Sequence, residues 1–160
     1  MAADEPPIIG VGHYWQDLDV GQRFRTLKRT ITETDLINFI GVTGMVEEMF
    51  IDATCDKGAA ASGRLVPAAL TYTLIEGLLV QSVLQATGLA LLEVHKKVLG
   101  PTVVGDTIHG VVEITALRPT STGGRGIVTT TVDIMNDRGV TVMHYDATRM
   151  MAGRPDARAT

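Results

Sequence analysis

The longest hydrophobic stretch of the chain lies between residues 68 and 85. Its large apolar side chains fall on most sides of a helix, which is typical of a helix that is buried rather than laid on a surface. Pro67 suits a first helical turn and Gly88 suits the exit from a helix. The sequence therefore predicts one long buried helix over residues 68–85. Its large apolar residues include Leu70, Leu74, Leu78, Val80, Val83 and Leu84.

Downstream of this stretch, apolar and polar residues alternate as they do in β-strands. Four segments show the alternation, at residues 91–99, 107–117, 126–135 and 140–151, and each predicts a strand. The Asn-Asp-Arg-Gly sequence at 136–139 separates the last two segments and predicts a hairpin turn. The second half of the chain is therefore expected to form antiparallel strands.

Upstream, residues 22–31 alternate well enough for one more strand. Thr32 is a good N-cap for a helix that Gly44 is expected to end. The irregular segment that follows could hold a short helix beginning at Asp52 and running through Cys55. The layout is one strand, a helix, an irregular segment, a long buried helix and four strands, which is an α+β arrangement with an antiparallel sheet curled around one helix. The hot-dog fold is the candidate architecture.

The two ends of the chain differ in composition from its centre. Residues 1–12 are rich in Pro and Gly and predict a flexible arm, which Tyr14 and Trp15 would anchor to the body. Residues 153–160 are polar and predict a flexible tail. With no linker or repeat between these ends, residues 1–160 are expected to form a single domain.

Composition and charge restrict the function classes. A formal net charge of −4 gives no support to nucleic-acid binding, which usually shows a basic patch. Glu76 and Gln81 interrupt the apolar stretch, so no membrane span is expected. The acidic N-terminus and the lone cysteine, Cys55, favour a cytoplasmic location. Hydrophobic residues at 45% fit a homodimer that buries part of its surface.

Four short segments, in order along the chain, resemble those of one family. They are the aromatic lead into a Val-Gly turn at 14–21, a Thr-Ile-Thr-Glu-Thr-Asp helix start at 30–35, a Gly-Arg-Leu-Val-Pro-Ala segment at 63–68, and a Pro-Thr-Val-Val-Gly-Asp turn at 101–106. The chain resembles the MaoC-like dehydratases, a family that includes (R)-specific enoyl-CoA hydratases. The resemblance covers roughly residues 14–153 and implies a single hot-dog domain.

The resemblance also implies an activity. Family members are lyases that add water to an enoyl thioester or remove it, on coenzyme A or an acyl carrier protein, and they need no other cofactor. They work as pairs of hot-dog units. An Asp and a His in an Asp-x-Asn-Pro-x-His segment supply the base and the acid. A backbone N–H at the start of the central helix polarises the thioester carbonyl.

This chain departs from the family at the catalytic segment. Aligned on the preceding Thr-Gly, the family's Asp falls on Met45 and its His on Phe50, while Asn and Pro become Glu47 and Glu48. Neither methionine nor phenylalanine exchanges a proton, so the family mechanism does not carry over. At the central helix start, Ala68 replaces the family's glycine and keeps a backbone N–H.

Three interpretations stay open. Glu47 and Glu48 could be the catalytic groups of a divergent hydratase, or they could be solvated on a surface turn. Alternatively the chain binds an acyl thioester, or completes a heteromeric catalytic partner, without doing chemistry itself. A thioesterase is the third interpretation, with Glu76 as its candidate carboxylate. Whether the chain is a hydratase or only binds a thioester, the candidate binding residues are Met45, Phe50, Gly63, Pro67 and Ala68.

The histidines add little to these candidates. None of the four has a spacing that predicts a metal site, so no metal is expected. His95 and Glu93 share a strand face and could pair, although an ordinary exposed strand residue is the plainer interpretation. His13 is expected to be exposed on the arm.

Overall fold

The computed structural model of the chain describes residues 6–57 and 63–155. Parts of the predicted arm and tail, residues 1–5 and 156–160, lie outside the described residues. So does the small-residue segment 58–62. The elements are η1 (Trp15–Asp17), β1 (Arg23–Arg25), β2 (Arg29–Thr30), α1 (Glu33–Thr43), α2 (Glu48–Ile51), α3 (Ala68–Val80), β3 (Gly88–Val98), β4 (Thr107–Pro119), β5 (Arg125–Asn136) and β6 (Thr141–Ala152).

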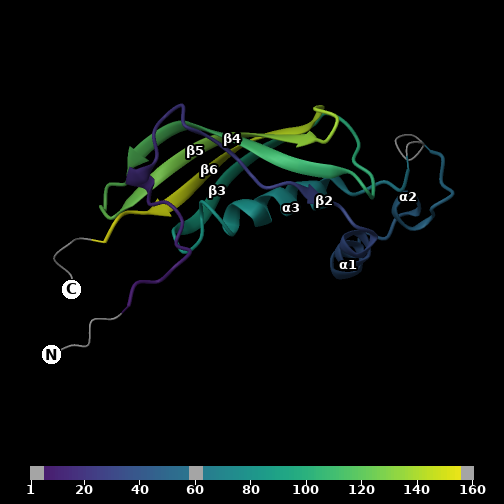
Figure 1. Cartoon of the computed structure of the whole chain (residues 1–160), viewed down its shortest axis with the longest axis horizontal. Coiled ribbons are helices and arrows are strands. Elements are labelled where there is room, and N and C mark those ends of the chain that lie inside the picture. Colours follow the sequence, from purple (N-terminus) through teal and green to yellow (C-terminus); the bar gives the residue numbers. More distant parts are fainter. Residues whose placement is uncertain (1–5, 58–62, 156–160) are drawn as a thin grey trace.

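One six-stranded antiparallel sheet dominates the structure. Its strand order is β1-β4-β5-β6-β3, with β2 also paired to β4. The sheet curls over α3, which lies along its inner face, while α1 and α2 lie beyond one end (Figure 1). This α+β arrangement is the predicted hot-dog architecture.

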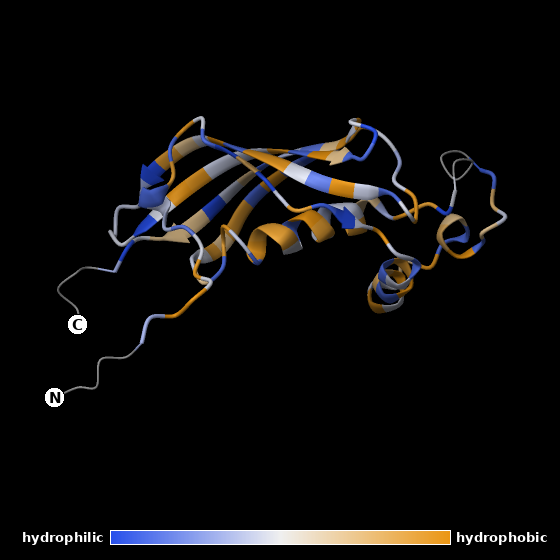
Figure 2. Ribbon diagram, viewed as in Figure 1, coloured by the Kyte–Doolittle hydropathy of each residue, from blue (hydrophilic) through white to orange (hydrophobic). Residues whose placement is uncertain are grey.

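The inner face of the sheet follows from strict alternation in β4, β5 and β6, whose side chains are buried at every second position along most of each strand. Figure 2 shows the resulting hydrophobic and polar alternation along the strands. The buried side chains of α3 pack against this face. The largest cluster joins Leu70, Ile75 and Leu79 of the helix to Val112, Val132, Ile134 and Tyr145 of the sheet, among others.

The first helix forms as the sequence predicts. Thr32 is its N-cap and accepts a hydrogen bond from the Asp35 amide, and the Asp35 carboxylate accepts one from the Thr32 amide in return. Gly44 ends the helix in the left-handed conformation, with φ 71°. The four strands predicted downstream also form, and their bounds lie within three residues of those predicted.

Two predictions upstream of α3 are wrong in detail. The expected strand at 22–31 is two short strands, because the Thr26 hydroxyl accepts a hydrogen bond from the Gly110 amide and takes the place of a regular ladder contact. A short helix does form in the next segment, but Asp52 is its C-cap and not its start. It is α2, and the Glu47 side chain caps it by accepting a hydrogen bond from the Met49 amide.

The central helix is shorter than predicted, because α3 ends at Val80 instead of residue 85. Beyond Val80 the chain continues in turns, because the Ser82 and Leu84 amides both donate to the Leu79 carbonyl instead of following the helical i to i−4 pattern, and the N-terminal arm pairs with the carbonyl groups that remain free there. The Gly12 amide donates to the Gln85 carbonyl at 2.7 Å, and the His13 amide donates to the Val83 carbonyl at 2.9 Å. Two residues of the N-terminal arm thus supply hydrogen-bond donors to carbonyl groups just beyond the end of the buried helix.

Trp15 anchors the arm, as predicted. Its indole ring lies against Gly126 on β5 so closely that a Cβ atom at Gly126 would fall 2.3 Å from the ring. The ring also packs against the small core cluster that includes Leu18, Ile114 and Met151. Of the helices in the described part of the chain, none has the length and apolar composition needed to cross a bilayer.

Candidate functional site

The start of α3 is held against the loop before β4. The Val66 amide donates to the Thr102 carbonyl at 2.9 Å, and Leu65 forms a β-bridge with Val103. One turn into the helix, the hydroxyl groups of Thr71 and Thr102 share a buried hydrogen bond of 2.6 Å. These contacts fix the position of the helix N-terminus relative to the sheet.

Two backbone amides at this end are available to a ligand. The Leu70 and Thr71 amides donate to the carbonyl of the N-cap residue, Pro67. The amides of Ala68 and Ala69 have no acceptor among the described residues, as expected for the first turn of a helix. The helix dipole adds partial positive charge at the same point, which favours an oxygen that gains negative charge.

A pocket of about 230 Å³ lies at the first of these two residues, Ala68. Phe50 reaches it from α2 and Ala68 from α3, so two of the predicted binding residues line the same pocket. Its lining is apolar apart from Thr71 and Thr102, whose hydroxyl groups already bond to each other. The lining residues are Phe50, Leu65, Val66, Ala68, Thr71, Val98, Gly100, Pro101, Thr102, Val142 and Met143.

Arg64 positions the phenylalanine in this pocket. Its Nε donates to the Phe50 carbonyl at 3.1 Å, and its guanidinium forms an ion pair with Glu33 at the start of α1. The Arg64 side chain is 17% exposed and the Glu33 side chain 64% exposed, so the ion pair faces water on its Glu33 side. The arginine therefore ties α1, α2 and the segment before α3 together.

The predicted catalytic glutamates lie outside the pocket lining. The Glu47 carboxylate caps α2, and the Glu48 carboxylate forms an exposed ion pair with Lys57. Met45 is also outside the lining, with 39% of its surface exposed. Among the described residues, the lining contains no side chain that exchanges a proton near neutral pH.

The remaining predicted binding residues flank the helix start. Pro67 is fully buried as the N-cap, and Gly63 is exposed with φ 137°, a backbone conformation that favours glycine. The structure thus brings Phe50, Pro67 and Ala68 to one end of α3. Gly63 and Met45 lie on the protein surface and do not line the pocket.

Glu76, the candidate carboxylate for a thioesterase, faces the inner side of the sheet rather than the pocket at the helix start. Its Oε1 accepts hydrogen bonds from the Tyr145 hydroxyl at 2.7 Å and from the Arg149 guanidinium at 2.5 Å. Burial and the neighbouring Glu76 carboxylate raise the pKa of Tyr145 far above its ordinary value. The carboxylate is therefore engaged in an internal polar network.

Sequence reasoning missed Arg149, which is 5% exposed and completes this network by donating to the Thr130 hydroxyl at 2.9 Å. A signal for it exists in the sequence. Met143, Tyr145, Ala147 and Met151 lie on the buried face of β6, and Arg149 falls on the same face by period two. A charged residue in that register predicts a buried partner.

The histidines do not form a metal centre. Within residues 6–57 and 63–155, no three ligand-type side chains gather closely enough to hold a metal ion. The His95 and Glu93 pair does form, at 2.8 Å, but on the exposed edge strand β3. The expectation for His13 is wrong. It is half-buried, and its Nδ1 is shielded from solvent with no hydrogen-bond partner among the described residues.

Comparisons with known proteins identify the fold. No family model matches the sequence, and no curated protein matches it. Among solved structures, the MaoC-like dehydratase from Rhodospirillum rubrum is 26% identical with a TM-score of 0.76, over 90% of this chain and 99% of that one. The (R)-hydratase from A. caviae involved in PHA biosynthesis is 25% identical with a TM-score of 0.71, over 88% of this chain and 99% of that one.

A third neighbour is larger. It is a conserved hypothetical protein of Mycobacterium tuberculosis with a double hot-dog fold, 18% identical with a TM-score of 0.81. The match covers 93% of this chain and 47% of that protein. The chain therefore has the hot-dog fold, and its structural neighbours are MaoC-like dehydratases and (R)-hydratases, which confirms the resemblance read from the four sequence segments.

Proposed function

We propose that the chain binds an acyl thioester, of the enoyl-CoA type, at the N-terminus of α3 as part of a MaoC-like hydratase or dehydratase. The pocket beside the available amides of Ala68 and Ala69 carries this proposal. The two amides receive the thioester carbonyl, and the helix dipole favours the charge that develops on its oxygen. The acyl group occupies the apolar pocket lined by Phe50. The carrier, coenzyme A or a carrier protein, stays outside, and no further cofactor is needed.

We favour a binding role in which a second hot-dog unit supplies the proton-transfer groups. Hydration adds hydroxide from water to the β-carbon and a proton to the α-carbon, so it needs a base and an acid. Met45 and Phe50 occupy the positions at which the family carries these groups, and the described lining offers no substitute. A double hot-dog neighbour, matched over about half its length, supports a function that requires two such units.

The second candidate is a hydratase that acts without a different partner. The observation in its favour is the position of Glu47 and Glu48 at the start of α2, the short helix that carries Phe50 into the pocket. In this reading one glutamate takes a proton from water and the other returns one to the α-carbon. A thioesterase that uses Glu76 ranks third, because that carboxylate is bonded to Tyr145 and Arg149.

The edge of the sheet supports the two-unit arrangement. In β3 every position except Val94 is exposed, and its free edge carries large apolar side chains. An exposed apolar edge strand is a template for pairing with another chain. We propose that a second copy pairs here, or a related catalytic subunit in its place. The exposed apolar residues of this edge are Leu89, Leu91, Leu92, Val98 and Leu99.

The test follows enoyl-thioester absorbance, free thiol and melting temperature together, with a panel of enoyl-CoAs. Silence in both reaction channels with a raised melting temperature supports the binding role. Hydration that is lost in Glu47→Gln or Glu48→Gln supports the second candidate. Thiol release alone moves the assignment to a thioesterase. An unchanged melting temperature without turnover rejects thioester binding altogether.

A variant pair tests the amides directly. Ala68→Pro removes the available N–H of the first helical position, where proline is tolerated, and Pro67 before it already has an extended ψ of 132°. Ala68→Val keeps that N–H and serves as the control. We expect the proline variant to weaken enoyl-CoA binding by roughly tenfold relative to the valine variant, as for the loss of one hydrogen bond to a partly charged oxygen. Equal binding by both variants would place the carbonyl elsewhere.

A further inference from the structure

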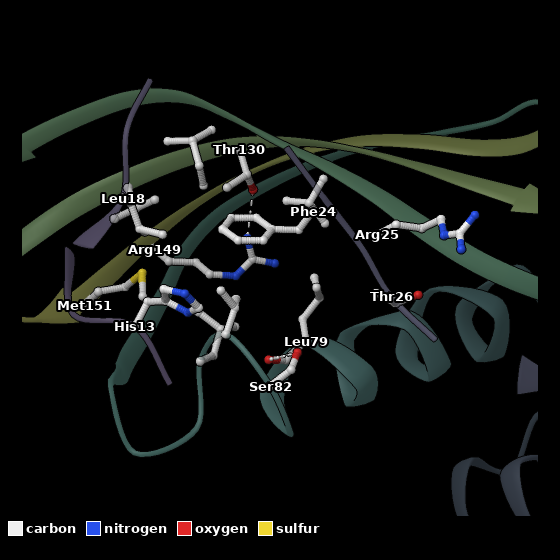
Figure 3. A pocket seen from close by; sticks show the side chains of 15 residues that line it. His13, Leu18, Phe24, Arg25, Thr26, Leu79, Ser82, Thr130, Arg149 and Met151 are labelled. Atoms are coloured by element: carbon white, nitrogen blue, oxygen red, sulfur yellow. Dashed lines mark hydrogen bonds between the residues drawn. The ribbon is translucent and has the colours of Figure 1, made fainter. Parts of the chain in front are cut away.

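A second pocket, of about 190 Å³, lies at the other end of α3 (Figure 3). The N-terminal arm, the end of the helix and the inner face of the sheet form its walls. Most of the lining is apolar, with Leu18, Phe24, Leu79 and Met151 among its side chains. None of the thioester site residues described above contributes to it. About 150 Å³ is enough to hold benzene in a dry protein cavity, so this pocket has the size for a small organic group.

Arg149 gives this apolar pocket its main polar feature. Its guanidinium donates to the Thr130 hydroxyl and to the Glu76 carboxylate. A guanidinium has five N–H donors, and within the described part of the chain these two contacts leave three of them without an acceptor. Since Glu76 balances the charge, the pair presents hydrogen-bond donors without a net charge.

His13 adds a second polar atom from the arm. Its ring lies 5.5 Å from the Phe24 ring, and its Nδ1 is buried with no partner in residues 6–57 and 63–155. An imidazole Nδ1 donates a hydrogen bond in one of its two neutral tautomers. A buried polar atom without a partner is costly, so a ligand that accepts this hydrogen bond would be stabilised. In Figure 3 Arg25, also on the lining, points away from Arg149 and His13.

We propose that this pocket binds a small uncharged group with an apolar body and one carbonyl oxygen, such as an aryl or alkyl ketone. The oxygen accepts hydrogen bonds from Arg149 or His13, and the body contacts Phe24 and Leu79. A carboxylate is disfavoured, because Glu76 already neutralises the arginine and would repel a second anion. A plain hydrocarbon is disfavoured because it leaves the donors unpaired.

Two sources can supply this chemistry. One is a free small molecule, which binds independently of the thioester site. The other is the distal end of a long acyl group, a source that rests on the proposed function. Ala68 and Leu79 are eleven residues apart on α3, or roughly 16 Å along the helix axis. Only a long chain, such as a 14-oxopentadecanoyl group, would place a ketone in this pocket from the helix N-terminus.

The experiment compares three probes of similar size: acetophenone, benzoate and ethylbenzene. Binding to the full chain is measured by calorimetry and by shifts of backbone amide signals. We expect acetophenone to bind at least tenfold more tightly than benzoate and several-fold more tightly than ethylbenzene. The His13→Ala variant, in the arm, should lose roughly three- to tenfold of the acetophenone affinity, as for one lost hydrogen bond. The double variant Glu76→Gln/Arg149→Met should reduce the preference for the ketone over the hydrocarbon to the part that His13 supplies.

The control is Phe50→Ala, which alters the thioester pocket and should leave acetophenone binding unchanged. Loss of acetophenone binding in this control, or affinities that follow apolarity alone in the unmodified chain, would overturn the proposal. Failure of all three probes to bind would do the same. Acetophenone binding without any response to enoyl-CoA would retain this pocket while rejecting the proposed function. Tighter binding of 14-oxopentadecanoyl-CoA than of pentadecanoyl-CoA would identify the acyl group as the source, and equal binding would identify a free ligand.

Discussion

The Glu76 carboxylate on α3 and the Arg149 guanidinium on β6 form an ion pair of 2.5 Å between the central helix and the inner face of the sheet. The side chains are 16% and 6% exposed, so both charges have lost most of their water. Tyr145 donates to the same carboxylate oxygen. A buried pair of this kind adds little net stability, but removing one of its two members is strongly destabilising.

The first prediction concerns this pair. Glu76→Gln leaves Arg149 without a counter-charge, and Arg149→Met leaves Glu76 without one. Each should lower the free energy of unfolding by about 3 kcal/mol. The double variant keeps an amide oxygen for the Tyr145 hydroxyl and buries no unpaired charge. It should therefore cost clearly less than the two single changes together, as measured in urea unfolding. Additive costs would contradict the coupling.

The second prediction concerns Tyr145 and alkaline pH. The folded state holds the phenol proton above the ordinary pKa of about 10, because the side chain is buried beside Glu76. Unfolding therefore releases a proton above pH 10, and stability falls as the pH rises there. This one group should remove about 1.4 kcal/mol by pH 11. Tyr145→Phe should show a flatter decline between pH 9 and pH 11, and parallel curves would assign the decline to other groups.

The third prediction concerns Trp15 and Gly126. A methyl group at Gly126 would fall inside contact distance of the indole ring, so Gly126→Ala should displace Trp15 and cost about 1–3 kcal/mol. Trp15 is the single tryptophan, so its fluorescence should shift to the red. Gly41 in α1 is the matched control, since a Cβ there meets nothing within 4 Å. Gly41→Ala should leave the fluorescence unchanged and stabilise the helix slightly.

The fourth prediction concerns the free edge of β3. Leu92 is 51% exposed on this strand, and Leu92→Lys adds a charge to the edge through which we expect two copies to pair. Sedimentation should show twice the 17.1 kDa chain mass before the change and the single mass after it. Leu27 lies off this edge with 81% exposure, and Leu27→Lys should leave the mass unchanged. A single mass for the unmodified chain would refute the homodimer.

The sequence predicted the elements whose signals are local. The caps of α1 at Thr32 and Gly44 require only neighbouring residues, and the alternation in β4, β5 and β6 requires only one buried face. The end of α3 was mispredicted because the apolar pattern continues past Val80, whereas the chain turns there and its free carbonyl groups at Val83 and Gln85 pair with the distant arm. Local propensity carries no information about such a contact.

The candidate site was predictable to a similar degree. The motif at the helix start located Pro67 and Ala68, and the replaced catalytic segment pointed to Phe50, which lines the same pocket. The role of Glu47 could not be inferred, because capping of α2 depends on where that short helix begins. Arg149 was missed although its register on β6 placed it inward, because its partner Glu76 lies 73 positions earlier.

The closure of α3 by the arm also sets an order of events during synthesis. The arm leaves the ribosome before α3 does, and its acceptors at Val83 and Gln85 follow only after roughly 70 more residues. The strand partner of Phe24 is synthesised later still, because β1 pairs with β4 at Val112. Contacts of such long sequence separation form slowly. The pocket at this end of the helix is therefore among the last parts of the molecule to come into existence, and a nascent chain that stops before β4 cannot bind anything there.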